Sequence, residues 1–148
     1  MVRYCAGRDL KVRLSGALEY LLTLSSGSVG AVSALHVVEH FGIHQIGRVL
    51  DEILRVLKPG GLLILETPNA HNVFVGSHDF YLDPTHVRPR PSELLRFVLQ
   101  MKGFSGIDVV PLRGEDKPPL SGKDGDAASF INEHFFGPRD YAVFATRI

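Results

Sequence analysis

The sequence predicts an α/β domain with a mostly parallel sheet covered by helices on both faces. Two observations support this prediction. Segments with helical and strand periods alternate along the chain, and the strand segments 29–35 and 62–66 are apolar and nearly free of charge, as buried parallel strands are. The chain has 148 residues, 45% of them hydrophobic, which is enough for one modest core. We therefore expect a single domain over residues 1–148.

The clearest single element is a helix over residues 43–57. Its apolar residues recur at three- and four-residue spacing, and charged residues occupy the opposite side. Gly60 and Gly61 then reverse the chain into the strand 62–66. Ligands of open α/β sheets bind at the carboxyl ends of such strands, so the loop that follows residue 66 is where we expect a site.

Weaker patterns give the remaining elements. The segment from residue 67 to residue 89 has no sustained period and is interpreted as a long loop, which inside a compact domain is often functional. The stretch 113–126 is polar and of low complexity, and we expect it to be a mobile loop. The other predicted helices are 1–7, 17–24, 91–102 and 126–136, and the other predicted strands are 11–14, 104–112 and 140–148.

Composition excludes several classes of partner. Sixteen basic residues balance sixteen acidic ones, whereas nucleic-acid binders usually carry a basic excess. A single cysteine, Cys5, allows no internal disulfide. The first residues contain no apolar secretory core, and no apolar run approaches the roughly 20 residues that span a bilayer. We expect a soluble, cytoplasmic protein with no nucleic-acid partner and no membrane span.

Three strings resemble the class I S-adenosylmethionine-dependent methyltransferases. They are GAVSALHVVEHF, VLDEILRVLKPGGLLILETPN and the closing GPRDYAVFATRI, and the resemblance covers nearly the whole chain. It implies a Rossmann-like sheet with an antiparallel final strand, and S-adenosylmethionine as the methyl donor. The string ETPNAHNVFVGSHDFYLDPTHVRP is similar to the subset that methylates sugar or sugar-phosphate ends of bacterial surface glycans, so a saccharide, sugar phosphate or related small molecule is the implied acceptor.

The resemblance also shows what does not precede Lys11. In the family, a glycine-rich loop after the first strand and an acidic residue after the second hold the cofactor, and this chain looks like the carboxyl-terminal two-thirds of such a domain, without its first two strands. Relatives often place an acid where Ser15 and Gly16 stand. We expect weak or no cofactor binding by this chain alone. The cofactor contacts that the resemblance leaves are Ser15, Gly16, Ala17, Leu35 and His36.

The string HVVEH, residues 36–40, follows a predicted buried strand. In a helical turn His36, Glu39 and His40 would share one face, and two imidazoles with a carboxylate suit a divalent metal. Quinone-pathway methyltransferases use a similar E-x-x-E-H string for a metal. The alternative is that His36 lines the cofactor, Glu39 caps backbone donors, and His40 packs or acts as a lone base.

The loop GSHDFYLDPTHVRPRP supplies the second set of candidates. Histidine is a side chain that can act as a base near neutral pH, so His86 is a candidate base. Tyr81 and Phe80 could stack on a sugar ring. The guanidinium groups of Arg88 and Arg90 could clamp a phosphate. The alternative is a structured lid with solvated arginines. The predicted catalytic residues are His40, His86 and Glu39, and the predicted acceptor-binding residues are Tyr81, Asp83, Arg88 and Arg90.

The two acceptor classes make different demands. A hydroxyl acceptor needs a base or a metal, whereas a phosphate monoester is already anionic and needs only cationic groups.

We interpret Glu66 as a cap of the turn that follows it, and His71, His78 and His134 as loop or surface residues.

The sequence thus indicates an O-methyltransferase domain, and the alternative is a non-catalytic module that binds a glycan or a partner. Without its first two strands the sheet would leave the uncharged strand 29–35 at an edge. Either the short segment 11–14 covers that edge, or two chains pair along it as a homodimer, which we expect because 11–14 is short and charged.

Overall fold

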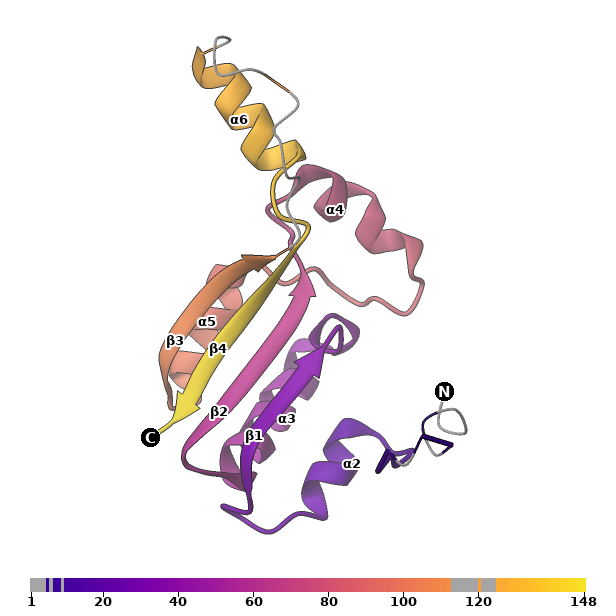
Figure 1. The fold of residues 1–148 in the computed structure, drawn as a ribbon, viewed down its shortest axis with the longest axis vertical. Helices are drawn as coiled ribbons and strands as arrows, with labels where there is room; N and C mark the ends of the chain where they lie inside the picture. The colour runs from indigo at the N-terminus through magenta and orange to yellow at the C-terminus, as the bar shows by residue number, and fades with distance from the viewer. Residues whose placement is uncertain (1–4, 6, 9, 113–119, 121–124) are drawn as a thin grey trace.

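The computed structural model describes residues 5, 7–8, 10–112, 120 and 125–148 (Figure 1). The expected helix over 1–7 and loop over 113–126 fall largely outside these residues. The elements in chain order are α2 (Ala17–Leu22), β1 (Val29–Leu35), the 3₁₀ turn η1 (Val38–His40), α3 (Ile43–Val56), β2 (Leu57–Pro68), α4 (Val73–Ser77), the 3₁₀ turn η2 (Asp79–Leu82), α5 (Ser92–Met101), β3 (Phe104–Leu112), α6 (Gly125–Phe135) and β4 (Asp140–Arg147).

The four strands form one sheet in the order β1-β2-β4-β3. β1 runs parallel to β2, and β4 runs antiparallel to both of its neighbours. Three strands therefore point the same way and the final strand points the other way, which confirms the predicted α/β class with an antiparallel last strand. No helix among the described residues has the length and apolarity needed to cross a membrane.

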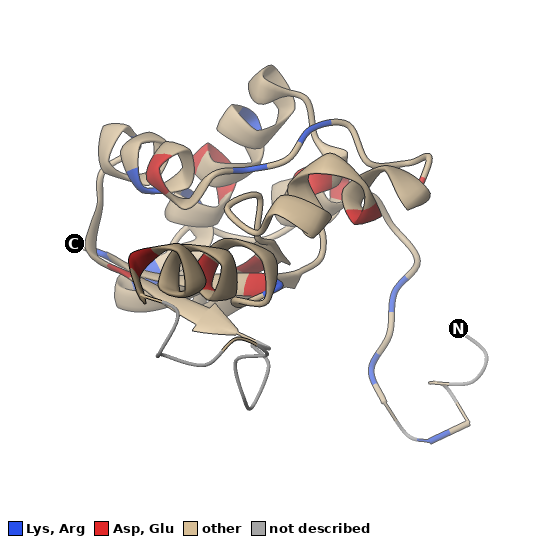
Figure 2. Cartoon of the chain, turned by 90° about the horizontal axis from the view of Figure 1, so that it is seen from above, with Lys and Arg blue, Asp and Glu red and all other residues tan. Residues whose placement is uncertain are grey.

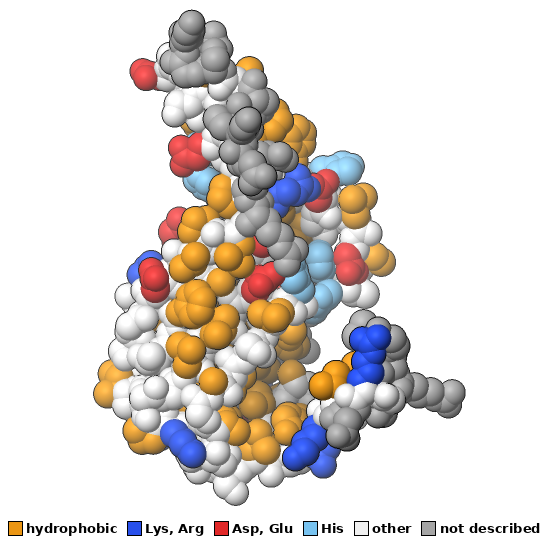
Figure 3. Space-filling view, in the orientation of Figure 1, with side chains coloured by type: hydrophobic (Ala, Val, Ile, Leu, Met, Phe, Trp, Pro, Cys, Tyr) orange, Lys and Arg blue, Asp and Glu red, His pale blue; other side chains and the backbone are white. Residues whose placement is uncertain are grey.

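The core lies between the sheet and the helices α3 and α5. α3 buries Ile46, Leu50 and Ile53, and β2 buries Leu63 and Leu65 on the same side. In Figure 1 both helices lie behind the sheet, so the helix cover expected on both faces is seen on one face in the described part of the chain. Figure 3 shows hydrophobic side chains over much of the front of the sheet.

The expected reversal at Gly60 and Gly61 takes a different form. β2 already begins at Leu57, and the register with β1 slips between the pair Val29–Leu57 and the pair Ala31–Leu62. Gly60 has a φ of 74°, in the left-handed region that favours glycine. The glycines thus form an irregularity inside a longer strand, because the neighbouring β1 offers partners on both sides of it.

The expected strand 11–14 is wrong. Residues 10–16 carry no regular structure, and this segment extends from α2 without joining the sheet (Figure 2). The segment is short and holds Lys11 and Arg13, and its apolar residues Leu10, Val12 and Leu14 are exposed rather than packed on the core. In the described part of the chain β1 consequently has a strand neighbour only on its β2 side.

The expected long loop 67–89 is irregular but contains two short helical turns, α4 and η2. The side chain of Asn72 accepts a hydrogen bond from the backbone nitrogen of Val75 and so caps α4. Farther along, the backbone nitrogen of Val87 donates to the carbonyl of Glu39 over 2.9 Å. The loop therefore folds back across the carboxyl end of β1.

Candidate functional site

His36 is the first residue beyond β1, and its backbone is strained. Its φ is 52°, a left-handed conformation uncommon for any residue but glycine, and its backbone nitrogen donates to the Glu66 carbonyl over 2.9 Å. The turn brings the imidazole among carboxylates. Nδ1 lies 3.3 Å from Glu39 Oε1, while Nε2 lies 3.2 Å from Glu66 Oε1 and 3.8 Å from Asp140 Oδ1. Such outliers collect at functional sites, where surrounding contacts hold them.

Glu39 is fully buried, which is costly for a carboxylate unless it has partners. Thr67 Oγ1 donates to Oε2 over 3.0 Å. Oε1 makes no hydrogen bond of good geometry and has the nearby His36 Nδ1 as its polar neighbour. The contact between Glu39 and His36 is therefore ionic in character, and it is strongest when His36 is protonated.

His40 and His86 face each other from η1 and the folded-back loop, with ring centroids 4.8 Å apart. His40 Nδ1 lies 3.1 Å from the Thr85 carbonyl, and His86 Nδ1 lies 2.7 Å from the Phe80 carbonyl. A carbonyl only accepts, so in both rings Nδ1 carries the proton. Nε2 of each neutral ring is then left as the proton acceptor or metal ligand.

Thr85 and Asp83 support His40 from behind. The Thr85 hydroxyl lies 3.0 Å from His40 Nδ1 and donates to Asp83 Oδ1 over 2.6 Å. The backbone nitrogen of Thr85 donates to the same oxygen over 2.8 Å. These hydrogen bonds from Thr85 lower the pKa of Asp83, so Asp83 is a charged group that orients its neighbours. The structure thus places Asp83 behind a predicted base.

Arg90 is not a phosphate clamp, and that prediction is wrong. Its side chain is 1% exposed, and its guanidinium donates to the carbonyls of Val38 and Phe41. Burial, and secondarily the charge of Arg88, lowers its pKa. Tyr141 Oη donates to the Arg90 carbonyl over 2.5 Å, and burial raises the pKa of this tyrosine. Arg90 fixes η1 from within, because the irregular loop turns its side chain into the core.

The other predicted acceptor-binding residues are accessible. Tyr81 is 63% exposed and packs edge-on against Phe80, and Arg88 is exposed. A pocket of about 150 Å³ lies beside His86. Arg139 pairs with Asp79 at its wall, and Asp140 closes it. The hydrogen bond from His78, followed by one from Arg139, lowers the pKa of Asp79.

The predicted metal set of His36, Glu39 and His40 is divided in the structure. One ligand atom each from Glu39, His40 and His86 lie within 4.8 Å of one another, and the same holds for His36, Glu66 and Asp140. Glu39 is thus grouped with His40, while its Oε1 lies 3.3 Å from His36 Nδ1, and His36 itself belongs to the second group. The predicted catalytic residues, by contrast, are brought together.

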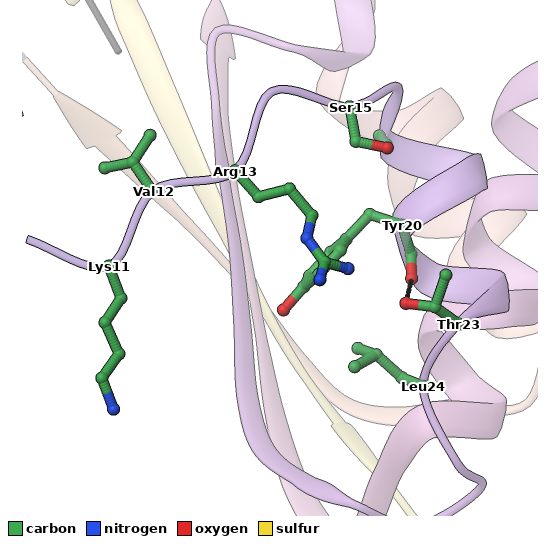
Figure 4. A pocket seen from close by; sticks show the side chains of 8 residues that line it. Lys11, Val12, Arg13, Ser15, Tyr20, Thr23 and Leu24 are labelled. Carbon is green, nitrogen blue, oxygen red and sulfur yellow. Dashed lines mark hydrogen bonds between the residues drawn. The ribbon is translucent and has the colours of Figure 1, made fainter. Parts of the chain in front are cut away.

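The predicted cofactor contacts lie around an open region. Ser15, Gly16 and Ala17 form the amino end of α2, while Leu35 and His36 lie at the carboxyl end of β1. A cavity of about 800 Å³ separates residues 11–13 from α2, and Figure 4 shows Arg13 above the Tyr20 ring within it. A second hollow of about 440 Å³ follows α2, β1 and α3 and has a mostly apolar lining. The 800 Å³ cavity is lined by none of the clustered histidines, so we place the chemistry at the pocket beside His86.

Sequence reasoning missed three members of this site. Asp140 begins β4, and the antiparallel pairing with β2 brings it beside the end of β1, which no local pattern reveals. Glu66 contacts His36 and is more than a cap of its own turn. Thr85 lies in the loop GSHDFYLDPTHVRPRP. Its position two residues after Asp83 is a typical signal of a turn closed by a hydrogen bond from side chain to backbone.

Comparisons with known proteins agree with this architecture. A family profile described as "Methyltransferase domain" matches residues 1–65. A protein of Mycolicibacterium smegmatis named "Probable S-adenosylmethionine-dependent methyltransferase" is 33% identical over 89 residues, which are 60% of this chain and 34% of that protein. The chain thus spans about a third of the length of this curated relative.

Two solved structures extend the likeness over the whole chain. A S-adenosylmethionine-dependent methyltransferase of Archaeoglobus fulgidus matches with a TM-score of 0.87 and 27% identity, over 99% of this chain and 72% of the other. One from Thermotoga maritima matches with a TM-score of 0.70 and 18% identity, over 100% and 69%. The latter likeness shows the fold alone.

The sheet with its antiparallel last strand and the polar cluster at its carboxyl end define a Rossmann-like methyltransferase domain. Over these stretches the chain is similar to S-adenosylmethionine-dependent methyltransferases. S-adenosylmethionine is the cofactor that this likeness implies.

Proposed function

We propose that the chain carries the acceptor side of an S-adenosylmethionine-dependent O-methyltransferase whose acceptor is a saccharide or a related small molecule. The observation that best supports this is the convergence of Glu39, His40 and His86 at the carboxyl end of the sheet. Two loops of one rigid sheet edge supply them, which is where α/β enzymes hold their ligands.

The cofactor fits the chemistry of the residues near the end of β1. S-adenosylmethionine would supply a methyl group on a cationic sulfonium. The carboxylates of Glu39, Glu66 and Asp140 surround His36 and provide negative charge there. Leu35, 55% exposed at the same strand end, offers apolar surface for an adenosine. The sulfonium cation of S-adenosylmethionine matches the carboxylates around His36, and its adenosine matches the apolar surface of Leu35.

A hydroxyl acceptor must lose its proton as the new O–C bond forms. His86 lines the 150 Å³ pocket, and its Nδ1 is held by the Phe80 carbonyl, so its Nε2 is the base that we propose. His40, oriented by Thr85, would receive or share that proton, and Glu39 would stabilise the positive charge nearby.

A divalent metal is a second way to lower the barrier. Bound by Glu39, His40 and His86, it would acidify a coordinated hydroxyl in place of a free base. A phosphate acceptor would need neither, and exposed Arg88 would then be its main cation. The paired histidines favour the hydroxyl.

The test is methyl transfer from S-adenosylmethionine to a neutral methyl glycoside and to a sugar phosphate, with and without a chelator. We expect His86→Ala to lower the rate with the glycoside by about 10²–10⁴-fold. His44→Ala, an exposed histidine on α3, is the matched control and should leave it unchanged. Loss of activity on chelation would favour the metal over the free base.

Transfer to neither acceptor at saturating cofactor would contradict the enzymatic proposal. The alternative is a non-catalytic module that binds a glycan or partner. Calorimetry with the same two acceptors then decides it, because such a module binds an acceptor without turnover. Calorimetry with S-adenosylmethionine alone shows separately whether this chain holds the cofactor.

A further inference from the structure

A second group of histidines lies outside the site described above. His71 follows β2 in a turn, and Glu133 and His134 lie in the last turn of α6. The rings of His71 and His134 are 4.5 Å apart between centroids, and His71 Nε2 lies 3.7 Å from Glu133 Oε1. One ligand atom from each of the three lies within 4.8 Å of the others. The sequence alone gave these residues no role.

We propose that His71, Glu133 and His134 bind a zinc ion and so form a metal clip between α6 and the turn after β2. Two imidazoles and a carboxylate, with water in a fourth position, are a common zinc donor set. Bonds of about 2.0–2.1 Å place tetrahedral ligand atoms roughly 3.3 Å apart. The 3.7 Å between His71 and Glu133 is already close to this, and both side chains are exposed and free to adjust.

The His134 ring is held in the orientation that a metal ligand needs. Its Nδ1 donates to the Phe130 carbonyl over 3.0 Å, and the ring stacks on Phe130 with centroids 4.1 Å apart. Nε2 is thereby left to bind the ion. Metal-binding histidines usually donate their other ring nitrogen to a carbonyl or carboxylate in this way.

The clip has a structural consequence. In Figure 1, α6 projects from the sheet beyond α4. The side chain of Asn72 donates to the carbonyls of Phe135 and Gly137, and Phe74 packs against Phe135. A metal beside these contacts would fix the end of α6. Arg139 and Asp140, which line the pocket at His86, follow directly, so zinc would order one wall of that pocket.

The test is calorimetry with zinc chloride on the full chain, purified without a histidine tag and stripped of metal. We expect one ion to bind with a dissociation constant of about 1 μM or tighter. His134→Ala, and separately His71→Ala in the turn, should weaken this at least about tenfold. His44→Ala, an exposed histidine on α3 outside both clusters, is the matched control and should leave the affinity within about twofold of the wild type. His40→Ala tests whether the ion binds the other cluster instead. Hydrogen exchange of residues 125–135 should slow when zinc binds.

Three results would overturn the clip. They are no binding at about 100 μM zinc, unchanged affinity in both clip variants, or loss of affinity only in His40→Ala, which would assign the ion to the other cluster. None of these readouts depends on methyl transfer, so they leave the proposed function to its own test. The folding of each variant is checked by circular dichroism, and two separate clip variants ensure that one misfolded protein does not decide the outcome.

Discussion

β1 has two boundaries with opposite chemistry. At its carboxyl end, His36 contacts the carboxylates of Glu39, Glu66 and Asp140. Along its outer side, the described residues place no strand, and the adjoining hollow of about 440 Å³ has a mostly apolar lining. The polar end has the groups that bind and activate a small molecule. The lateral edge has the properties of a surface that a further strand would cover.

The difference shows that the two boundaries meet different physical requirements. The groups at the polar end are costly to bury and are held by many specific hydrogen bonds, so single substitutions there should have large effects. The lateral edge is uncharged from Val29 to Leu35, whereas edges that remain exposed usually carry charges or prolines. Its properties should therefore depend on what pairs with it.

The largest expected effect is at Arg90, which supports the polar end from within. Arg90→Ala should lower the free energy of unfolding by about 2–5 kcal/mol, because the carbonyls of Val38 and Phe41 lose a buried donor. Urea denaturation measures it. Arg88→Ala, two residues away and exposed, is the control and should change stability by less than about 0.5 kcal/mol. Similar losses in both variants would contradict the structural role of Arg90.

The next largest effect concerns the lateral edge, where we propose self-association. Two copies of β1 pairing antiparallel about a two-fold axis would satisfy the unpaired backbone groups. Sedimentation equilibrium at roughly 100 μM should show a partly populated dimer, as expected even for a contact of about −5 kcal/mol. Ser33→Lys should weaken it at least about tenfold by placing like charges at the pairing edge. A strictly monomeric wild type at that concentration rules the pairing out.

A smaller effect should separate acceptor classes. Arg88→Ala should weaken binding of a sugar phosphate about fivefold while leaving the matching neutral sugar unchanged, because only the phosphate gains a charge-assisted hydrogen bond. Calorimetry with both ligands is the measurement. Equal weakening of the two would show that Arg88 does not recognise phosphate.

The smallest effect is a change in titration at the polar end. Thr85→Val removes a hydrogen bond that lowers the pKa of Asp83, so this pKa should rise toward its ordinary value. A lowered carboxyl pKa stabilises the fold above the unfolded value, and the stabilisation is lost as pH falls through the folded value. The variant should therefore lose less stability on acidification. Carboxyl NMR shifts measure the change in the pKa of Asp83, with Asp79 as the unchanged reference.

The elements that were predicted correctly have long, regular patterns. α3 shows its apolar stripe over four turns, and the apolar runs 29–35 and 62–65 form neighbouring parallel strands. The expected burial of 29–35 is wrong, because no residue of β1 is buried in the described structure. The prediction of a strand over 11–14 was wrong because four residues, two of them charged, are too short for a long regular pattern. The segment also has no strand neighbour in the described fold. The bulge in β2 could not be predicted, because it depends on the register with β1.

The site was predictable in its residue types and less so in its geometry. Glu39 and His40 were predicted from one string and His86 separately from the loop, and the structure brings the three together through the fold-back at Val87. Arg88 and Arg90 looked alike in sequence. In an irregular loop no period tells which side chain points inward, so burying Arg90 required the three-dimensional path.

The position of β4 has a consequence for folding during translation. β2 pairs with β1 on one side and with β4 on the other, and Leu62 meets Thr146. During translation β1 and β2 leave the ribosome together, but the opposite edge of β2 has no partner until the last strand has been made. Contacts so distant in sequence form slowly, and unpaired apolar edges invite association with other nascent chains. We therefore expect the interval between the synthesis of β2 and β4 to be when this chain is most prone to such association.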